Sequence, residues 1–507
     1  MKKSLFLLFA LLIWIPMQVH AETLHRGNGA EVDSLNIHQA QGLNSHNVIR
    51  DMYEGLMTLD IKGEPVLGVA ESYKNDGLVW TFKLKKEAKW SDGNPVRAED
   101  FIRAWHQALK PEEAAPYSFL FSTIKNGQKI IDGIESVESL SVRALDERSL
   151  QIELEKQDID FLEKLTSPIF YPLPNEKSLD YKVSNGVYQL EKRVLQEKLI
   201  LKKNPYHYDQ ANAFYDEVVY WVTENQASEL KRFRAKELDI TESIPDNQIT
   251  WLKQNHPDEL RIFPYLGSFF LGLNLNDKYL KNLDLRKALY YAIDRDILVS
   301  KVLKSGQKPA YSIVPNELLT TKDDVFSRKK QIELAKKHFN KAGINPKTLK
   351  LQILYNSSQN QKKVALAVAA MWRQTLGIKS ELRNQEWKVF TQTRKSNNKQ
   401  IFRSGWIADY SSPFSFLELF ESSSRFNFYA YENNKYDKLI FEAKNNQQNY
   451  QELLSRAQSL LINDLPVIPL YYYVSRHMVS KTLKGFEDNV SDRHLSRYIH
   501  SERRGET

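Results

Sequence analysis

The 507-residue chain contains no cysteine at all. This absence excludes disulfide bridges, a thiol nucleophile, an iron–sulfur cluster and a zinc site built on thiolates. It also excludes a lipid anchor attached to an N-terminal cysteine. Any stability or chemistry of the protein must therefore come from packing, hydrogen bonds and the remaining polar side chains.

Long apolar runs are also lacking after the N-terminal segment. Lys2 and Lys3 precede an apolar stretch over residues 5–15, and a small-x-small sequence ends at Ala21. The stretch is shorter than the ~20 residues that a membrane-spanning helix needs. The pattern therefore predicts a cleaved signal peptide over residues 1–21 and a mature protein in the periplasm, without a lipid anchor.

A concentrated basic region is missing although the chain is basic overall. The sequence has 71 lysines and arginines against 63 acids, which gives a formal net charge of +8. These cations are scattered among acids, and no basic run with interleaved aromatic residues forms a phosphate-binding track. We expect no nucleic-acid partner. The hydrophobic fraction of 42% is that of a globular protein, and the length predicts two to four domains.

Local catalytic motifs are absent as well. The sequence has no zinc-hydrolase histidine pair, no Walker A loop and no G-x-S-x-G elbow. Gly27 and Gly29 begin a dinucleotide fingerprint, but Val32 stands where its third glycine belongs. We expect no enzyme activity, no cofactor and no metal site. A hydrolase with a scattered triad stays open as an alternative.

Predicted helices and strands alternate along the chain, which is typical of the α/β class. Leu349–Tyr355, Lys362–Leu376 and Ile378–Leu382 form a predicted strand, helix and strand, and such a β-α-β unit implies parallel strands. No repeat or low-complexity linker marks a domain boundary. The other predicted elements are strands at Val79–Leu84, Leu150–Leu154, Gln400–Ala408 and Val467–Val474, and helices at Ala98–Leu109, Leu285–Leu303 and Lys330–Ala342.

The segment Ala88–Phe101, AKWSDGNPVRAEDF, resembles the signature of the large periplasmic solute-binding proteins of peptide ABC importers, family 5. By itself it is a turn at Asp92 and Gly93 followed by a helix after Pro95, so its role is architectural. The block Asn384–Phe416 is similar to the oligopeptide-binding branch of that family. Further similar segments are Gly29–Leu35, Tyr53–Leu56, Gly68–Ser72, Asn185–Tyr188, Asn204–Tyr206, Asp294-Arg295, Tyr355-Asn356 and Tyr471–Tyr473.

The resemblance implies a periplasmic-binding-protein fold of type II, cluster C. Two α/β lobes would enclose a cleft, with a hinge between them and an extra third domain. The implied division after the signal peptide is a discontinuous lobe I (22–43, 168–266 and 477–507), an extra domain II (44–167) and a lobe III (267–476).

The charged ends of a peptide have implied partners in the block Asn384–Phe416. Asp409 follows an apolar predicted strand, and a buried carboxylate is costly unless a cation pairs with it. The resemblance implies that Asp409 binds the peptide's α-ammonium, and that Arg394 and Arg403 meet its C-terminal carboxylate. A turn or N-cap aspartate is the alternative for Asp409.

The resemblance also implies strand addition, in which the backbone of this chain pairs with an extended peptide. Gln361 stands where the oligopeptide binder has a histidine, and Gly272 where it has an acid at the pocket rim. Both departures leave the accepted length and side-chain preference open. The other implied contacts are the backbone at Glu31, Val32, Gly405 and Ile407, and the rings of Trp387, Trp406, Tyr117 and Tyr473.

The function implied is capture of short peptides and their delivery to the membrane permease and ATPase subunits of an ABC importer. We expect a monomer. Binding of a murein tripeptide for cell-wall recycling is the alternative within the family. A periplasmic hydrolase and a chaperone that binds unfolded chains are alternatives from other classes.

Overall fold

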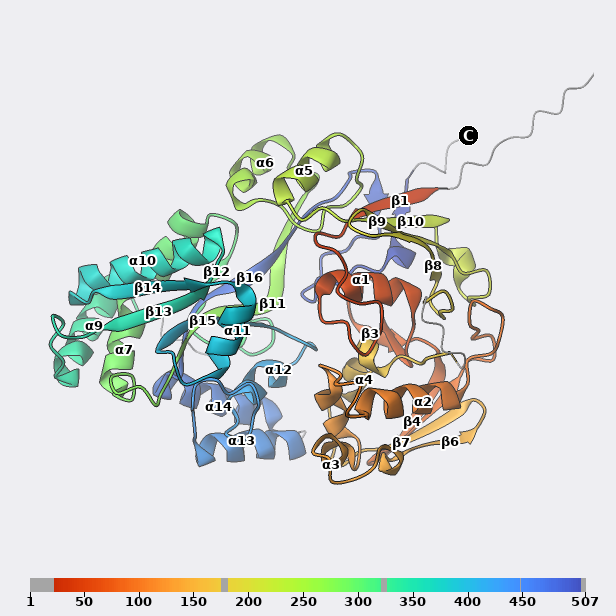
Figure 1. Ribbon diagram of the computed structural model, residues 1–507, viewed down its shortest axis with the longest axis horizontal. Coiled ribbons are helices and arrows are strands. Elements are labelled where there is room, and N and C mark those ends of the chain that lie inside the picture. Colours follow the sequence, from red (N-terminus) through yellow and green to blue (C-terminus); the bar gives the residue numbers. More distant parts are fainter. Residues whose placement is uncertain (1–21, 175–180, 321–325, 447, 503–507) are drawn as a thin grey trace, which may run out of the picture.

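The computed structural model describes residues 22–174, 181–320, 326–446 and 448–502. The predicted signal peptide lies outside these residues. Among the described helices, none is both long and apolar enough to span a membrane. Figure 1 shows two halves side by side, with α5 (Gln226–Arg234) and α6 (Ile249–Asn255) above them.

A six-stranded mixed sheet forms the framework of one half, in the order β12-β16-β11-β15-β13-β14. The central strand β11 runs antiparallel to β15 and β16, whereas β13 lies parallel to β14 and β15. The predicted β-α-β unit is confirmed. The strands are β11 (Leu260–Leu273), β12 (Lys308–Pro309), β13 (Leu351–Asn356), β14 (Ser380–Gln385), β15 (Ile401–Ile407) and β16 (Val467–Met478).

Glycine ends two helices of this half where the chain needs a left-handed residue. The helix α9 (Arg328–Ala342) stops at Gly343 with φ 66°, and α10 (Gln359–Leu376) stops at Gly377 with φ 72°. A residue without a Cβ adopts this conformation at little cost. The other helices here are α7 (Leu283–Ala292), α8 (Arg295–Ile297), α11 (Trp387–Lys395), α12 (Phe414–Leu417), α13 (Asn434–Asn445) and α14 (Tyr450–Asp464).

The single helix predicted over Leu285–Leu303 is wrong. Ile293 is extended (φ −84°, ψ 124°) and ends α7, after which Asp294 caps α8 and a π-helical turn follows. The buried guanidinium of Arg295 donates from Nε to two backbone carbonyls, at 2.8 and 2.9 Å. These tertiary hydrogen bonds fix the break, which an amphipathic pattern does not reveal.

The other half contains two four-stranded sheets and two short strand pairs. The first sheet has the order β1-β10-β9-β8 and the second, all antiparallel, has the order β4-β5-β7-β6. Their strands are β1 (Thr23–Gly27), β4 (Ala70–Asp76), β5 (Val79–Leu84), β6 (Val142–Asp146), β7 (Ser149–Glu153), β8 (Tyr188–Val194), β9 (Lys198–Lys203) and β10 (Glu217–Trp221). The pairs are β2 (Met57–Leu59) with β3 (Pro65–Leu67) and β17 (Leu483–Lys484) with β18 (His500–Ser501), and the helices are α1 (Leu43–Met52), α2 (Ala98–Leu109), α3 (Gly127–Ile131) and α4 (Phe161–Lys164).

The AKWSDGNPVRAEDF segment is architectural, as predicted. Gly93 takes the turn with φ 89°, and α2 begins after Arg97. The carboxylate of Asp100 accepts hydrogen bonds from the Trp90 indole at 3.0 Å and from the Arg97 backbone at 2.9 Å. One buried acid thus joins the turn to the first turn of the helix.

The chain crosses between the halves along β11 and β16, which extend from the six-stranded sheet toward α5 and α6 (Figure 1). The pairing of these strands is irregular between Pro264 and Ser268. Elsewhere the halves touch directly: the Lys164 ammonium lies 4.8 Å from the Tyr410 ring, and Glu163 accepts a hydrogen bond from the Ser411 backbone.

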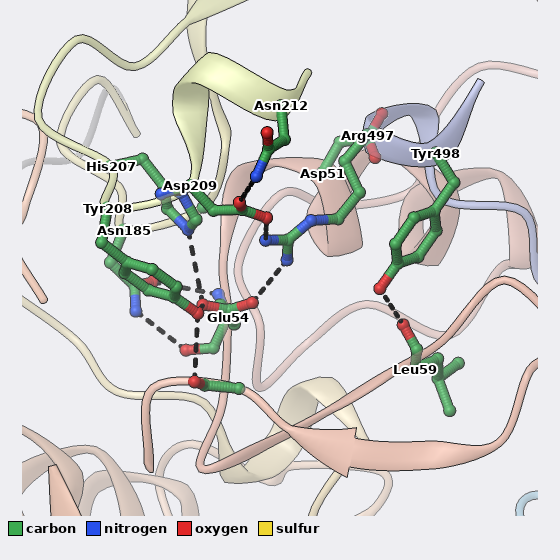
Figure 2. A network of polar contacts seen from close by, with 12 residues as sticks. Asp51, Glu54, Leu59, Asn185, His207, Tyr208, Asp209, Asn212, Arg497 and Tyr498 are labelled. Carbon is green, nitrogen blue, oxygen red and sulfur yellow. Dashed lines mark hydrogen bonds and ion pairs between the residues drawn. The ribbon is translucent and has the colours of Figure 1, made fainter. Parts of the chain in front are cut away.

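A buried ionic network joins the C-terminal segment to the half that contains the two four-stranded sheets (Figure 2). The guanidinium of Arg497 contacts Glu54 at 2.5 Å and Asp209 at 2.9 Å, while the Tyr208 hydroxyl donates to Glu54 at 2.6 Å. Burial disfavours ionisation of Glu54, but the charge of Arg497 outweighs it and holds the pKa of this carboxyl below its ordinary value. His207 completes the network at 3.4 Å from Glu54.

Candidate ligand-binding site

Strand β15 carries the centre of the site. Arg403, Gly405 and Ile407 alternate with inward residues and therefore share one face of the sheet. A Cβ on Gly405 would lie 2.8 Å from the Tyr473 hydroxyl, and one on Gly267 would lie 2.4 Å from the same ring. The two glycines thus make room for Tyr473 on this face, while Ile407 is 38% exposed at the strand end.

Asp409 lies just beyond β15, between the two halves. Its backbone is fixed, because the carbonyl accepts from Arg493 at 2.9 Å and the amide donates to Ser415 at 3.0 Å. Within the described parts of the chain, no hydrogen bond or salt bridge to its carboxylate is formed. Burial raises the pKa of Asp409 to about 7; the charge of Arg493 opposes this rise and Glu418 reinforces it. A cation bound beside Asp409 would offset the free-energy cost of burying its ionised carboxylate.

Tyr117, in the other half, is near enough to Asp409 for the charge of the acid to act on it. Burial and then the negative charge of Asp409 raise the pKa of Tyr117 to about 12. Its ring lies 5.7 Å from the His46 ring of α1. The structure therefore brings an aromatic residue of one half and the acid of the other half near each other.

Two arginines without acidic partners lie at the other end of the site. Among the described residues neither Arg394 nor Arg403 forms a salt bridge, and the Nε of each is buried without a hydrogen bond. Arg403 lies 5.5 Å from the Phe269 ring and 5.8 Å from the Trp387 ring, and Arg394 lies 4.9 Å from the Phe428 ring. Aromatic faces hold these cations, and Arg403 also has a hydrogen bond with the Tyr473 hydroxyl. With no acid beside them among the described residues, their remaining donors can bind a carboxylate.

The two predicted tryptophans occupy different surroundings. Trp387 is 48% exposed and stacks on Phe390 at 5.8 Å. Trp406 packs edge-on against Phe426 at 5.0 Å, and its buried indole Nε1 has no hydrogen-bond partner among the residues that the structure describes. Gln361, at the start of α10, likewise has a buried side-chain oxygen without a partner. The Trp406 indole, on β15, is therefore the predicted polar atom that a ligand beside this strand could meet.

Glu31 and Val32 lie in the loop after β1. The Glu31 carboxylate pairs with Arg193 at 2.8 Å and accepts from the Gln196 backbone at 2.7 Å. Val32 is buried, and its carbonyl accepts from Arg193 at 3.4 Å. The side chain of Glu31 is therefore held within its own half, and only backbone of this segment remains for pairing.

The placement of Gly272 at a pocket rim is wrong. A Cβ here would lie 2.4 Å from Phe402 and 2.7 Å from Tyr429, and both rings are buried. The residue lies inside the packed interior beneath stacked aromatic rings. A glutamate at this position would have no path to a ligand.

Arg493 was not predicted from the sequence, although its guanidinium holds the Asp409 carbonyl. The two residues are far apart in the chain, and no local pattern links them. Close to Arg493, the side chains of His477 and His494 both contact one Asp492 carboxylate oxygen, at 2.8 and 3.1 Å. Their ligating atoms lie within 4.8 Å of one another, and these hydrogen bonds join the C-terminal segment to β16.

Comparisons with known proteins agree with this arrangement. Residues 64–428 match the family of bacterial extracellular solute-binding proteins, family 5 (Middle). The chain is 37% identical to the periplasmic oligopeptide-binding protein OppA of Salmonella typhimurium, over 92% of this chain and 90% of that protein. It is 34% identical to the periplasmic murein peptide-binding protein MppA of Escherichia coli, over 90% and 89%.

Two solved structures share the fold over almost the whole chain. The Escherichia coli murein tripeptide binding protein MppA has a TM-score of 0.85 at 32% identity, with 95% of this chain and 98% of that one covered. Haemophilus influenzae OppA in complex with the peptide RPPGFSPFR has a TM-score of 0.82 at 31% identity, with 95% and 99% covered. From the sequence match, the mixed α/β fold and these neighbours, the chain belongs to the family 5 bacterial extracellular solute-binding proteins.

Proposed function

We propose that this chain is the periplasmic substrate-binding component of an ABC importer and captures short peptides with free termini. One observation carries the proposal: Arg403 within β15, Arg394 on α11 and Asp409 just beyond β15 have opposite charges and form no salt bridge among the described residues. Asp409 offers a carboxylate to an α-ammonium, and Arg394 and Arg403 offer guanidinium groups to a carboxylate. Charge-assisted hydrogen bonds at both ends select a zwitterionic, extended ligand.

The spacing of these charges sets the expected ligand length. Arg403 and Asp409 are six positions apart, which is about 20 Å of extended backbone. The arginine side chains shorten this span by several ångströms. Peptides of about three to five residues, at roughly 3.3 Å per residue, fit the remaining distance.

The proposed domain division follows the family resemblance. Lobe I comprises residues 22–43, 168–266 and 477–507, domain II residues 44–167, and lobe III residues 267–476. The irregular pairing between Pro264 and Ser268 lies near the first proposed crossing. A ligand that contacts both lobes favours the closed form, which is the form offered to the permease and ATPase subunits.

A murein tripeptide is the second candidate ligand, and the likeness to MppA favours it. It shares the free amine and the carboxylates, so Asp409 and the two arginines serve it equally. Export through the predicted signal peptide, action as a monomer and the absence of any catalysed reaction are further parts of the proposal.

Mass spectrometry of the native protein as purified, followed by denaturation, tests the ligand class. Release of mixed short peptides supports the general importer. Release of a single mass containing diaminopimelate assigns murein tripeptide instead. Hydrolysis products after a day's incubation with peptides would contradict the binding function, and equal binding of N-acetylated and free tripeptides would indicate a chaperone.

Peptide affinity should depend on pH in a bell shape. The pKa of Asp409 is about 7 in the free protein, so below pH 7 the acid is protonated and affinity should fall by about tenfold per pH unit. Above about pH 8 the peptide's α-ammonium loses its proton and affinity falls again. Calorimetric titrations with tri-alanine from pH 5 to 9 measure this profile. In Asp409→Asn the acidic limb should vanish, and an unchanged limb would contradict the assignment.

A further inference from the structure

A recess of about 530 Å³ lies beside the candidate site, where the two halves meet. Its charged lining residues are Lys395, Lys399 and Arg425, and no acid is present among the described residues that line it. The rings of Phe426 and Phe428 form apolar parts of its wall. A hollow with one sign of charge and apolar walls concentrates ligands of the opposite sign.

Arg425, in the wall of the recess, contacts residues of both halves. Its guanidinium donates to the Pro116 carbonyl of the other half at 3.1 Å. It also lies 4.6 Å from the Phe119 ring and 4.9 Å from the Phe426 ring. Because residues of both halves contribute, the recess is complete only when the halves are together.

Lys399 is a buried cation in the recess, with 7% of its surface exposed. Burial, and then repulsion by Arg394, lowers the pKa of this ammonium to about 8. Within the described residues, neither Lys399 nor Lys395 nor Arg425 forms a salt bridge with an acid. Lys399 donates to the Ser396 carbonyl, and the negative charge of Asp409 acts on Arg425. An added carboxylate would nevertheless relieve the repulsion between the cations.

The recess adjoins the ligand-binding site through its aromatic wall. Phe426 packs against Trp406 with ring centres 5.0 Å apart, and Phe428 lies under Arg394 at 4.9 Å. Trp406 lies on β15 between Arg403 and Asp409, whereas Arg394 belongs to the carboxylate end of the site. A side chain in the middle of a bound peptide can therefore reach the recess.

We propose that this recess binds acidic side chains, so that the protein favours peptides with an internal aspartate or glutamate. The inference rests on the peptide-binding function proposed above and names its substrate class. The free α-carboxylate meets Arg394 and Arg403, whereas the additional carboxylate meets Lys395, Lys399 and Arg425.

Tetrapeptides of alanine with one internal residue changed to glutamate, glutamine or lysine test the proposal by calorimetry at low salt. At the second or the third position, glutamate should bind at least tenfold more tightly than its neutral isostere glutamine, and lysine should bind more weakly than glutamine. High salt should reduce the preference, because charge attraction is screened. Equal affinity for the glutamate and glutamine peptides at both positions would overturn the proposal.

Lys395→Glu supplies the matched variant, because this lysine is exposed and its substitution disturbs no packing. The ratio of glutamate to glutamine affinity should fall by about tenfold. Lys347→Glu makes the same charge change on an exposed lysine outside the recess and should keep the ratio. An unchanged ratio in Lys395→Glu, or an equal fall in Lys347→Glu, would contradict the proposal that the recess binds acidic side chains.

Tetra-alanine separates the two proposals. If it binds and the glutamate and glutamine peptides bind alike, only the acidic preference fails. If neither tetra-alanine nor any of its variants binds, the peptide-binding function itself fails, and the recess proposal falls with it.

Discussion

Asp409→Asn is expected to lower the affinity for short peptides by about a hundredfold or more. The substitution keeps the shape of the side chain but removes the charge that pairs with the α-ammonium. Breaking a buried charge pair from one side typically costs about 3–5 kcal/mol, because the remaining charge is left unpaired. Calorimetric titration of tri-alanine against both proteins measures the loss.

The same variant should be more stable than the wild type when no ligand is present. The pKa of Asp409 is about 7 in the folded protein and about 3.8 in an unfolded chain. The folded state therefore holds its proton more firmly, and stability contributed by this group is lost as pH rises from about 4 through 7. At pH 8 the asparagine removes this cost, so the melting temperature should rise. Unchanged peptide affinity, or a lower melting temperature, would contradict the role of Asp409.

N-acetylated tri-alanine provides a control on the ligand side. It lacks the ammonium, so it should bind the wild type weakly and should lose little further affinity in Asp409→Asn. A loss as large as that of the free peptide would mean that the substitution damages the site by another route.

Arg497→Met is expected to destabilise the fold by about 3–5 kcal/mol, since it leaves the Glu54 carboxylate buried without its cation. Chemical denaturation at pH 7 measures the difference. The pKa of Glu54 is lowered in the folded protein, so the stabilisation is present above the unfolded pKa and is lost as pH falls. The difference in the free energy of unfolding between wild type and variant should therefore become smaller at acidic pH.

Two further variants separate the ionic network from general damage. In the pair Glu54→Gln with Arg497→Met both charges are gone, and most of the lost stability should return. Lys125→Met breaks a salt bridge to Glu153 on the surface, where the two side chains are 46% and 39% exposed. This control should cost less than about 1 kcal/mol. A double variant as unstable as Arg497→Met would show that the arginine acts by packing alone.

Short-range patterns predicted the local structure well because local sterics and hydrogen bonds decide it. The β-α-β unit, the ends of α9 and α10 at glycine, and the turn before α2 all follow from residues within a few positions of one another. The break at Ile293 was missed because its cause lies in backbone carbonyls that approach Arg295 from distant segments.

The candidate site was predicted in part for the same reason. Asp409 at the end of an apolar strand is a local pattern, and the structure places it between the halves with a raised pKa. Gly272 was misplaced, because only the packing of Phe402 and Tyr429 shows that its position is interior. Arg493 was missed because its contact with Asp409 bridges segments that are far apart in the chain.

The sequence by itself determined what chemistry is open to this protein: no thiol chemistry, an α/β framework, and a strand that ends in a carboxylate and carries an arginine. The tertiary structure alone decided which charges are left without partners, which glycines make room for Tyr473, and that three cations share one recess between the halves. The physical reason is that a side chain's identity is local, whereas its burial and its partners depend on segments that only folding brings together.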